Sequence, residues 1–363
     1  MHTWSRPLQA TLLTLTVCSV FGMGGFLLSR AYFTTSTRMK ADSLPGESAS
    51  DVSHAPLEVA QNRHPLTGMP IPENATTTRP FAIVIDNTPE ARPQWGLSSA
   101  DIIYNPLVEG GITRLVAVFS SQSSVKIGPV RSARPYFIHQ AQDWGAAFAH
   151  SGGSVQALEL LEAGAPSVDD FNEFANGRFF WRTNARAPHN LFTSTDQLTQ
   201  GAATRGFSST SSLGALWNLT DEADPALRPA SFFSIPYLMP SSVVSYTWDE
   251  VRQGYTRTTG GTPHLDAATS EVLTPTNVII EFRAFKDIAD PHRYGLVDFA
   301  YEGSGEFLAF TQGRLIEGSW SRAQNGPTQY LTKSGSRLTL AHGKTFIEVV
   351  PTSIRDKVIA TIR

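Results

Sequence analysis

Four short apolar runs in the first half of the chain constrain its fold most strongly. They occupy residues 81–85, 101–104, 113–119 and 145–150. Uninterrupted apolar runs of this length are typical of strands that are covered on both faces. Pro135 opens a helical segment between the third and fourth runs, and Gly164 ends another helical segment after the fourth. This alternation predicts an α/β domain with a mixed sheet covered by helices.

The second half of the chain has a different pattern. After a proline-rich stretch come short segments that are rich in β-branched and aromatic residues and separated by glycine-containing turns. Such segments predict a smaller β-rich C-terminal domain. We therefore expect an α/β domain over 64–207, an irregular connection over 208–240 and the β-rich domain over 241–363.

The N-terminal segment predicts attachment to a membrane. Residues 10–29 carry no charge, and crossing a bilayer takes roughly 20 apolar residues. We expect residues 1–30 to be a retained anchor or signal segment and 31–63 a flexible tether, with the body on the extracytoplasmic side. Two alternatives stay open, namely a cleaved signal peptide and a lipoprotein attached through Cys18.

Composition narrows the classes of function. The formal net charge of −3 argues against a nucleic-acid partner, because that role requires a basic face. Cys18 is the one cysteine of the chain, so the body has no disulfide, cysteine zinc site or thiol nucleophile. No spacing typical of a metal triad stands out, and we expect no cofactor.

Polar residues follow three of the predicted strands. Asp86 and Asn87 come after the first strand, Glu109 after the second, and His150 and Ser151 after the fourth. In open α/β sheets, ligands bind beyond the carboxyl ends of the strands. These side chains are therefore candidates for a shared binding site, although Asp and Asn also favour ordinary turns.

Two arginines near the start of the predicted helix suggest an anion site. Arg131 and Arg134 are three residues apart and could both point toward one phosphate or carboxylate. The alternative is that they form structural salt bridges, for which the candidate acids are Asp101, Glu109 and Asp143.

Two further segments add candidates. Gly152 and Gly153 lead into a helix whose N-terminus offers free N–H groups to an anion, unless this is a plain turn capped by Ser154. A polar loop carries residues suited to anion binding or proton transfer, or is simply a solvated loop: Arg182, Arg186, His189 and Asn190. In the second half, we expect His264 and Asp266 to lie in a surface turn.

Long motifs occupy residues 84–119, 126–137 and 187–194 in the first half of the body, and 276–282, 305–320 and 343–351 in the second half. These motifs resemble the YerB-like bacterial lipoprotein family, known as domain of unknown function 3048 with N- and C-terminal halves. Together they span most of residues 64–351. The resemblance implies a membrane-attached envelope protein in two parts, and implies no established activity.

The order of residues 113–119, 130–137 and 147–164 carries a second resemblance. These segments are similar to the core of the LytR-CpsA-Psr phosphotransferases, which act on glycopolymers linked to a pyrophosphate lipid. This resemblance implies that Arg131 and Arg134 hold pyrophosphate, with Asp86 or Glu109 near a magnesium ion. The chain departs from that pattern at Arg114, where the family has an acidic residue.

We therefore expect an extracytoplasmic module that binds an anionic ligand, such as a cell-wall polymer or a lipid-linked phosphate, or an envelope protein. The alternative is a phosphotransferase, so whether the chain is an enzyme stays open. Both hypotheses require the strand-end acids and the arginines to meet in the folded chain.

Overall fold

A computed structural model describes residues 62–73, 77–164, 168–210, 214–288, 295–324 and 326–363. The predicted anchor and all but the last two residues of the predicted tether lie outside these ranges. Among the described residues, no helix has the length and apolar character needed to cross a bilayer. All of the described residues belong to one compact unit.

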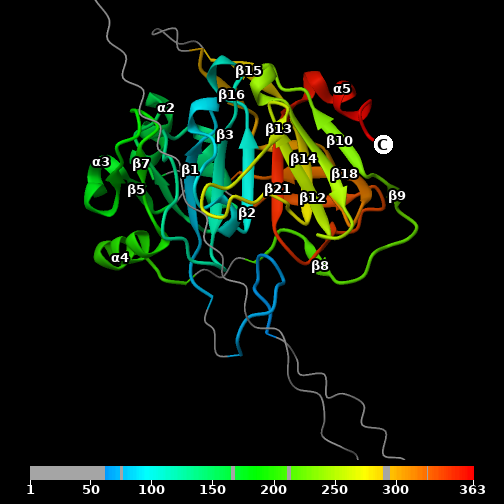
Figure 1. Cartoon of the computed structure of the whole chain (residues 1–363), viewed down its shortest axis with the longest axis horizontal. Helices are drawn as coiled ribbons and strands as arrows, with labels where there is room; N and C mark the ends of the chain where they lie inside the picture. Colours follow the sequence, from blue (N-terminus) through cyan, green and yellow to red (C-terminus); the bar gives the residue numbers. More distant parts are fainter. Residues whose placement is uncertain (1–61, 74–76, 165–167, 211–213, 289–294, 325) are drawn as a thin grey trace, which may run out of the picture. The chain divides into compact units, whose positions relative to one another are not determined.

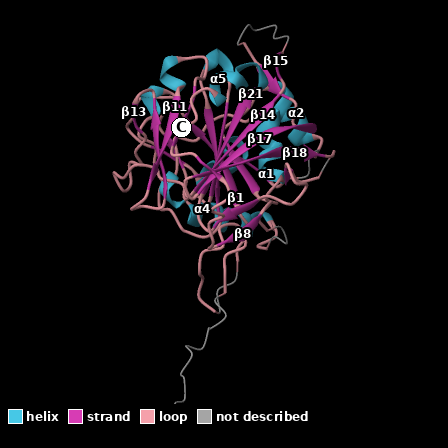
Figure 2. Ribbon diagram, turned by 90° about the vertical axis from the view of Figure 1, so that its right-hand side faces the viewer, coloured by secondary structure: helices cyan, strands magenta, loops and turns pink. Residues whose placement is uncertain are grey.

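A central mixed sheet of eleven strands forms the frame of this unit. Its order is β19-β18-β17-β14-β21-β2-β3-β1-β4-β5, with β9 paired to β18. In Figure 2 its strands fan out through the middle of the molecule, as expected from the twist of a large sheet. The strands are β1 (Phe81–Asp86), β2 (Ile102–Pro106), β3 (Arg114–Phe119), β4 (Ala147–His150), β5 (Asp170–Asn172), β9 (Arg228–Pro229), β14 (Asn277–Arg283), β17 (Gly303–Thr311), β18 (Arg314–Arg322), β19 (Gln329–Thr332) and β21 (Thr345–Pro351).

The two halves of the sequence meet in the middle of this sheet. Strand β2 runs parallel to β21, with Ile102 opposite Thr345 and Pro106 opposite Val349. Figure 1 shows the two strands side by side, β2 in cyan and β21 in red. The predicted fold class is confirmed, with helices in the N-terminal region and many strands in the C-terminal region. The predicted domain bounds stay a prediction.

Helices lie mainly in the N-terminal half. Ser154 caps α2 by accepting a hydrogen bond from the Ala157 N–H, and Gly206 ends α4 in the left-handed conformation at φ +70°. The α-helices are α1 (Pro135–Gln142), α2 (Val155–Glu162), α3 (Glu173–Asn176), α4 (Thr195–Arg205) and α5 (Arg355–Ile359). Short 3-10 helices are η1 (Pro89–Ala91), η2 (Leu97–Ser99), η3 (Glu109–Gly111), η4 (Gly177–Phe179), η5 (Pro240–Ser242) and η6 (Thr352–Ile354).

The two faces of the central sheet are covered by different layers. On β2, the Tyr104 hydroxyl accepts a hydrogen bond from Trp144 Nε1, just after α1, at 2.9 Å. The next residue, Asn105, donates to Glu348 on the opposite face, where Tyr246 of a second sheet also reaches Glu348. Phe233 of that second sheet stacks on Phe310 of β17. Buried apolar side chains of one core cluster pack on both faces of the sheet.

Smaller sheets complete the unit. The second sheet has the strand order β10-β11-β12-β13, all antiparallel. Its strands are β10 (Phe232–Ile235), β11 (Val244–Asp249), β12 (Gly254–Thr259) and β13 (Thr262–Pro263). Three two-stranded sheets pair β15 (Phe285–Asp287) with β16 (Val297–Phe299), β8 (Asn218–Thr220) with β20 (Thr339–Ala341), and β6 (Trp181–Arg182) with β7 (Leu191–Phe192).

One edge of the central sheet gathers the polar strand ends. Strands β1, β4 and β5 are parallel, so their carboxyl ends share this edge. Strand β3 is antiparallel to both β1 and β2, and its first residue, Arg114, lies opposite Asp86. The segment that follows β2, with Glu109, therefore emerges at the same edge. We call this the carboxyl edge.

Candidate functional site

A buried carboxylate lies at the centre of the carboxyl edge. The Asp86 side chain is only 1% exposed, and its Oδ2 lies 3.0 Å from Arg131 Nε in an ion pair. The same oxygen accepts a hydrogen bond from His189 Nδ1 at 2.8 Å. His189 is 103 residues away in sequence, so the loop that carries it folds back over the end of β1.

Two more arginines lie beside this pair. Arg134, the residue before α1, pairs with Glu109, and both side chains are largely buried. Arg114 is buried and donates through one terminal nitrogen to Ser132 O at 3.1 Å. Its Nε has no hydrogen-bond partner among the described residues, and neither has Arg131 Nε, whose contact with Asp86 is an ion pair without hydrogen-bond geometry. We call Asp86, Glu109, Arg114, Arg131, Arg134 and His189 the arginine cluster.

Burial and neighbouring charges together set the pKa values in the arginine cluster. Burial lowers the pKa of Arg114 to about 10, and repulsion by Arg134 acts in the same direction. Burial raises the pKa of Asp86, whereas a backbone N–H and the charges of Arg131 and Arg114 lower it, and the pKa ends below its ordinary value. The pKa of Glu109 is also lowered, because bonding to Arg134 outweighs the effect of burial. Three guanidinium groups thus share two carboxylates.

A second chain of polar contacts adjoins the arginine cluster. The Ser151 N–H donates to the carbonyl of Arg131 at 3.0 Å, and the Ser151 hydroxyl donates to Glu173 at 2.7 Å. Glu173 in turn pairs with Arg182, which donates to Asn190 at 3.2 Å. Glu173 therefore connects Ser151 with Arg182 and Asn190, which belong to two separate predicted segments. Glu173 itself was not among the predicted site residues.

Some candidates do not face solvent. His150 is fully buried, and its ring nitrogens contact Gly152 O and Asp170 Oδ1, each at 2.7 Å. Asn87 is fully buried as well and donates to Thr113 at 2.8 Å. Both residues support the edge from within and are not positioned to touch a ligand.

The remaining candidates are the predicted arginines and glycines, and they have different partners. Arg134 pairs with Glu109, one of the three acids considered as salt-bridge partners, whereas Arg131 pairs with Asp86, which was not among them. Gly153 bridges to Ala133, and Arg186 is exposed in its loop. Gly152 has φ +62°, and a Cβ there would lie 2.9 Å from the Phe174 ring, so this position requires glycine.

Exposed apolar side chains flank the arginine cluster. Phe174 is 78% exposed beside Gly152, and Leu158, which lies beside Gly153, is also exposed. Across the cluster, Leu238 is 60% exposed and lies against Gly111, two residues from Glu109. Singly exposed apolar side chains are common on protein surfaces, and these three lie next to Gly152, Gly153 and Gly111.

A fully buried polar network, which was not predicted from the sequence, extends from the arginine cluster toward the second sheet. Gln94 donates to the Asp86 carbonyl and to Asn87 Oδ1, both at 2.9 Å, and its Oε1 lies 2.8 Å from His264 Nε2. The other ring nitrogen of His264 contacts Arg257. Arg257 pairs with Glu348, which also accepts from Asn105, Tyr237 and Tyr246.

This network corrects the expectation for His264 and Asp266. Both are 1% exposed, so they do not lie in a surface turn. Asp266 accepts hydrogen bonds from the Gly96, Ser98 and Ala268 N–H groups, whereas His264 belongs to the network. A sequence signal existed, since Glu348 interrupts an otherwise apolar run that reads as a buried strand.

We expect Asp86→Asn to lower the free energy of unfolding by about 2 kcal/mol near pH 7, because Arg114 and Arg131 lose their shared counter-charge. Urea unfolding measures the change. The folded pKa of Asp86 is depressed, so its contribution is present above the unfolded value and is lost as pH falls through the folded value. The difference in unfolding free energy between wild type and Asp86→Asn should therefore become smaller at acidic pH. Asp298→Asn, which removes a partner of the exposed Lys286, is the control and should have little effect.

No group of three or more His, Cys, Asp or Glu side chains in the described ranges is arranged to hold a metal ion. Of the two acids considered for magnesium, Asp86 is paired with Arg131 and Glu109 with Arg134.

Comparisons with known proteins agree with this architecture. Residues 66–208 match the family model "Protein of unknown function (DUF3048) N-terminal domain", and residues 233–347 match the corresponding C-terminal domain. The chain is 36% identical over 290 residues to the Bacillus subtilis (strain 168) protein described as "Putative lipoprotein YerB", covering 79% of this chain and 86% of that protein. A crystal structure of the YerB protein from Bacillus subtilis superposes with a TM-score of 0.70 at 32% identity, covering 80% of this chain and 97% of that chain. The chain therefore belongs to the DUF3048 family, with both its N-terminal and its C-terminal domains.

Proposed function

We propose that this protein is an extracytoplasmic, membrane-attached module that binds a phosphate-bearing envelope ligand at the arginine cluster. Arg131 is the contact residue, since its side chain is 25% exposed while the Asp86 side chain beneath it is 1% exposed. His189, 19% exposed, lies next to it on the same carboxylate. A guanidinium held on one side by a buried carboxylate is preorganised to donate its remaining N–H groups to an anion.

The observation that carries this proposal is the imbalance of charge and hydrogen bonding in the arginine cluster. Three arginines face two carboxylates, and the buried Arg114 Nε lacks a partner among the described residues. A buried donor left without an acceptor destabilises the free protein by about 1–3 kcal/mol. An anion near Arg114 and Arg131 would supply the missing negative charge.

The flanking apolar side chains favour an amphiphilic ligand over a purely polar polymer. Phe174 and Leu238 lie on two sides of the cluster, and both are largely exposed. Together with the arginines they fit a phosphate carried on a lipid. A free inorganic anion would contact only the arginines, and its affinity should be lower.

Attachment to the membrane places such a ligand within reach. The Bacillus subtilis relative carries the description of a lipoprotein, and Cys18 is the one cysteine of this chain. Residues 10–29 are uncharged and long enough to remain as an anchor. Mass spectrometry of the protein purified from membranes distinguishes a chain that retains residues 10–29 from a chain that begins at a lipid-modified Cys18.

Binding is tested with the full chain in a nonionic detergent, with farnesyl diphosphate and inorganic pyrophosphate as probes. Arg131→Gln should weaken farnesyl diphosphate binding roughly tenfold or more, the loss expected for one charge-assisted contact. Arg63→Gln is the matched control, because Arg63 is an exposed arginine that pairs with Asp221. Calorimetry or fluorescence titration gives the dissociation constants.

Two outcomes would contradict the proposal: no binding of either probe, or equal affinities for the two arginine variants. Inorganic pyrophosphate should bind more weakly than farnesyl diphosphate if the apolar flanks contribute. Adding magnesium provides a further reading, because cleavage of farnesyl diphosphate that depends on magnesium and on Arg131 would identify an enzyme in place of a binding module.

A further inference from the structure

A pocket lies at the opposite edge of the central sheet from the arginine cluster. It opens beside Thr345 at the start of β21, which is paired with Ile102 at the start of β2. Its volume is about 610 Å³. Small-molecule sites typically enclose about 300–1,000 Å³. Residues within 97–103, 270–275 and 344–346 line it, together with Arg252.

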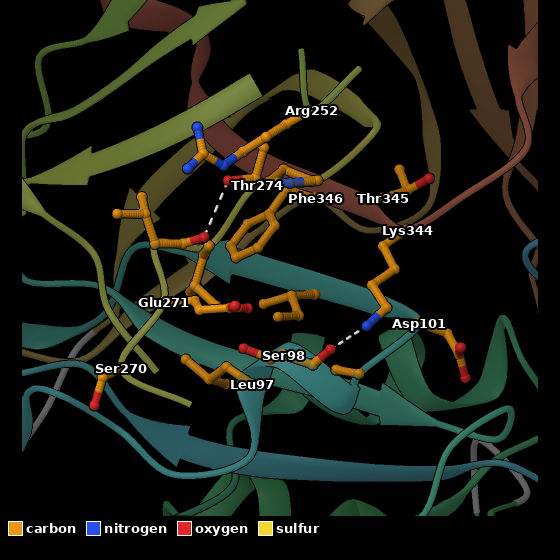
Figure 3. A pocket seen from close by; sticks show the side chains of 15 residues that line it. Leu97, Ser98, Asp101, Arg252, Ser270, Glu271, Thr274, Lys344, Thr345 and Phe346 are labelled. Carbon is orange, nitrogen blue, oxygen red and sulfur yellow. Dashed lines mark hydrogen bonds between the residues drawn. The ribbon is translucent and has the colours of Figure 1, made fainter. Parts of the chain in front are cut away.

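The floor of the pocket is apolar. Leu97, Ile103, Leu273 and Phe346 line it, and each is almost fully buried. Figure 3 shows the Phe346 ring in the middle of the pocket, with Lys344 and Glu271 on opposite sides. An apolar floor with a few charged groups at its margins is the usual composition of a site for a small amphipathic molecule.

Lys344, on one side of the pocket, has no counter-ion among the described residues, and neither has Glu271 on the other side. Its Nζ donates to the Ser98 carbonyl and lies 3.5 Å from Gln122 Oε1, and it forms no salt bridge within the described part of the chain. Burial lowers the pKa of Lys344, and the negative charges of Asp101 and Asp266 only partly oppose this effect. The ammonium group is thus partly desolvated and lacks an ion-pair partner.

The two nearby carboxylates are committed elsewhere. Asp101 accepts hydrogen bonds from the backbone N–H groups of Ser120 and Ser121, at 2.7 and 2.9 Å. Asp266 accepts from the backbone N–H groups of three residues, among them Ser98 at 2.6 Å. Neither therefore neutralises Lys344 directly. The guanidinium of Arg252, which also lines the pocket, pairs with Asp249.

We propose that this pocket binds a small amphipathic monocarboxylate, whose carboxylate pairs with Lys344 and whose apolar body packs on Ile103 and Phe346. The carboxylate supplies the counter-ion that Lys344 lacks, and it accepts charge-assisted hydrogen bonds. Glu271, on the far side, repels a second anionic group and so selects against dicarboxylates. The site is independent of the arginine cluster, because it lies at the other edge of the sheet.

The test uses the full chain in nonionic detergent, with 4-phenylbutyrate, 4-phenylbutanol and 4-phenylbutylamine as probes. Saturation-transfer NMR and equilibrium dialysis should show that the acid binds roughly tenfold or more tightly than the alcohol or the amine, as expected for one ion pair. Lys344→Gln should remove this preference, whereas Lys344→Arg should keep it. Lys333→Gln is the matched control, since Lys333 is 73% exposed and pairs with Glu317.

Partition of the probes into micelles is the same for every variant, so it cancels in the comparison. The proposal is overturned if the wild-type chain binds the three probes equally or binds none of them. It is also overturned if folded Lys344→Gln binds the acid as tightly as wild type does. The three probes partition into micelles to different extents, so their affinities for the wild-type chain are calculated from free concentrations measured beside protein-free micelles. Absence of an acid preference in the wild-type chain then overturns the proposal even if Lys344→Gln does not fold.

Discussion

Arg257→Met is expected to lower the free energy of unfolding by about 3–5 kcal/mol near pH 7, the range for breaking one partner of a buried ion pair. Arg257 and Glu348 are both fully buried, and 3.3 Å separates their charged groups. Without Arg257, the Glu348 carboxylate keeps only neutral donors, which are Asn105, Tyr237 and Tyr246. Urea unfolding, followed by fluorescence and circular dichroism, measures the change.

Arg252→Met provides the matched control, because Arg252 belongs to the loop between β11 and β12 and its side chain is 66% exposed. Its replacement should change the free energy of unfolding by less than about 0.5 kcal/mol. Combining Arg257→Met with Glu348→Gln should recover part of the loss, since the buried charge is then gone while an acceptor remains. Equal effects of Arg257→Met and Arg252→Met would show that the buried pair contributes nothing to stability.

The Arg257–Glu348 pair is also an example of a contact that local sequence patterns cannot predict. Local patterns predicted β1, β3 and β4 from apolar runs, α1 from Pro135, and the start of α2 from Ser154. Those signals are local, because they depend on neighbours within one turn or one strand. No such signal pairs Ile102 with Thr345, a contact between halves of the chain that only the assembled sheet specifies.

Some features of the candidate site could likewise be predicted from the sequence, and others could not. Asp86, Arg131 and Arg134 could be named individually from their positions at strand and helix ends. The antiparallel bridge between Val130 and Ile85 is what brings Arg131 beside Asp86. Their partners could not be chosen from the sequence, since Arg131 had several acids within plausible reach. His150 was predicted as a ligand contact because it follows a strand, but it is fully buried. The sequence position alone does not distinguish an exposed histidine from a buried one.

The second large expected effect is a loss of stability at acidic pH. Burial, together with the positive charge of Arg322, lowers the pKa of His139 to about 4 from an ordinary value of 6.5. The ring stacks on Tyr301, and Arg322 lies 3.3 Å from its Nδ1. In the unfolded chain His139 takes up a proton near pH 6.5, whereas the folded protein resists this until about pH 4. The unfolded state therefore binds more protons between these values, and stability falls as the pH falls.

We expect His139 alone to account for about 2–3 kcal/mol of this loss between pH 6.5 and pH 4, since one pKa unit corresponds to about 1.4 kcal/mol. His139→Gln keeps an acceptor for Arg322 but cannot be protonated, so its unfolding free energy should depend less on pH across this window. Burial raises the pKa of Asp143, which also bonds Arg322, and this opposes the histidine in both proteins. Identical slopes for wild type and His139→Gln would rule out this histidine as a source of acid sensitivity.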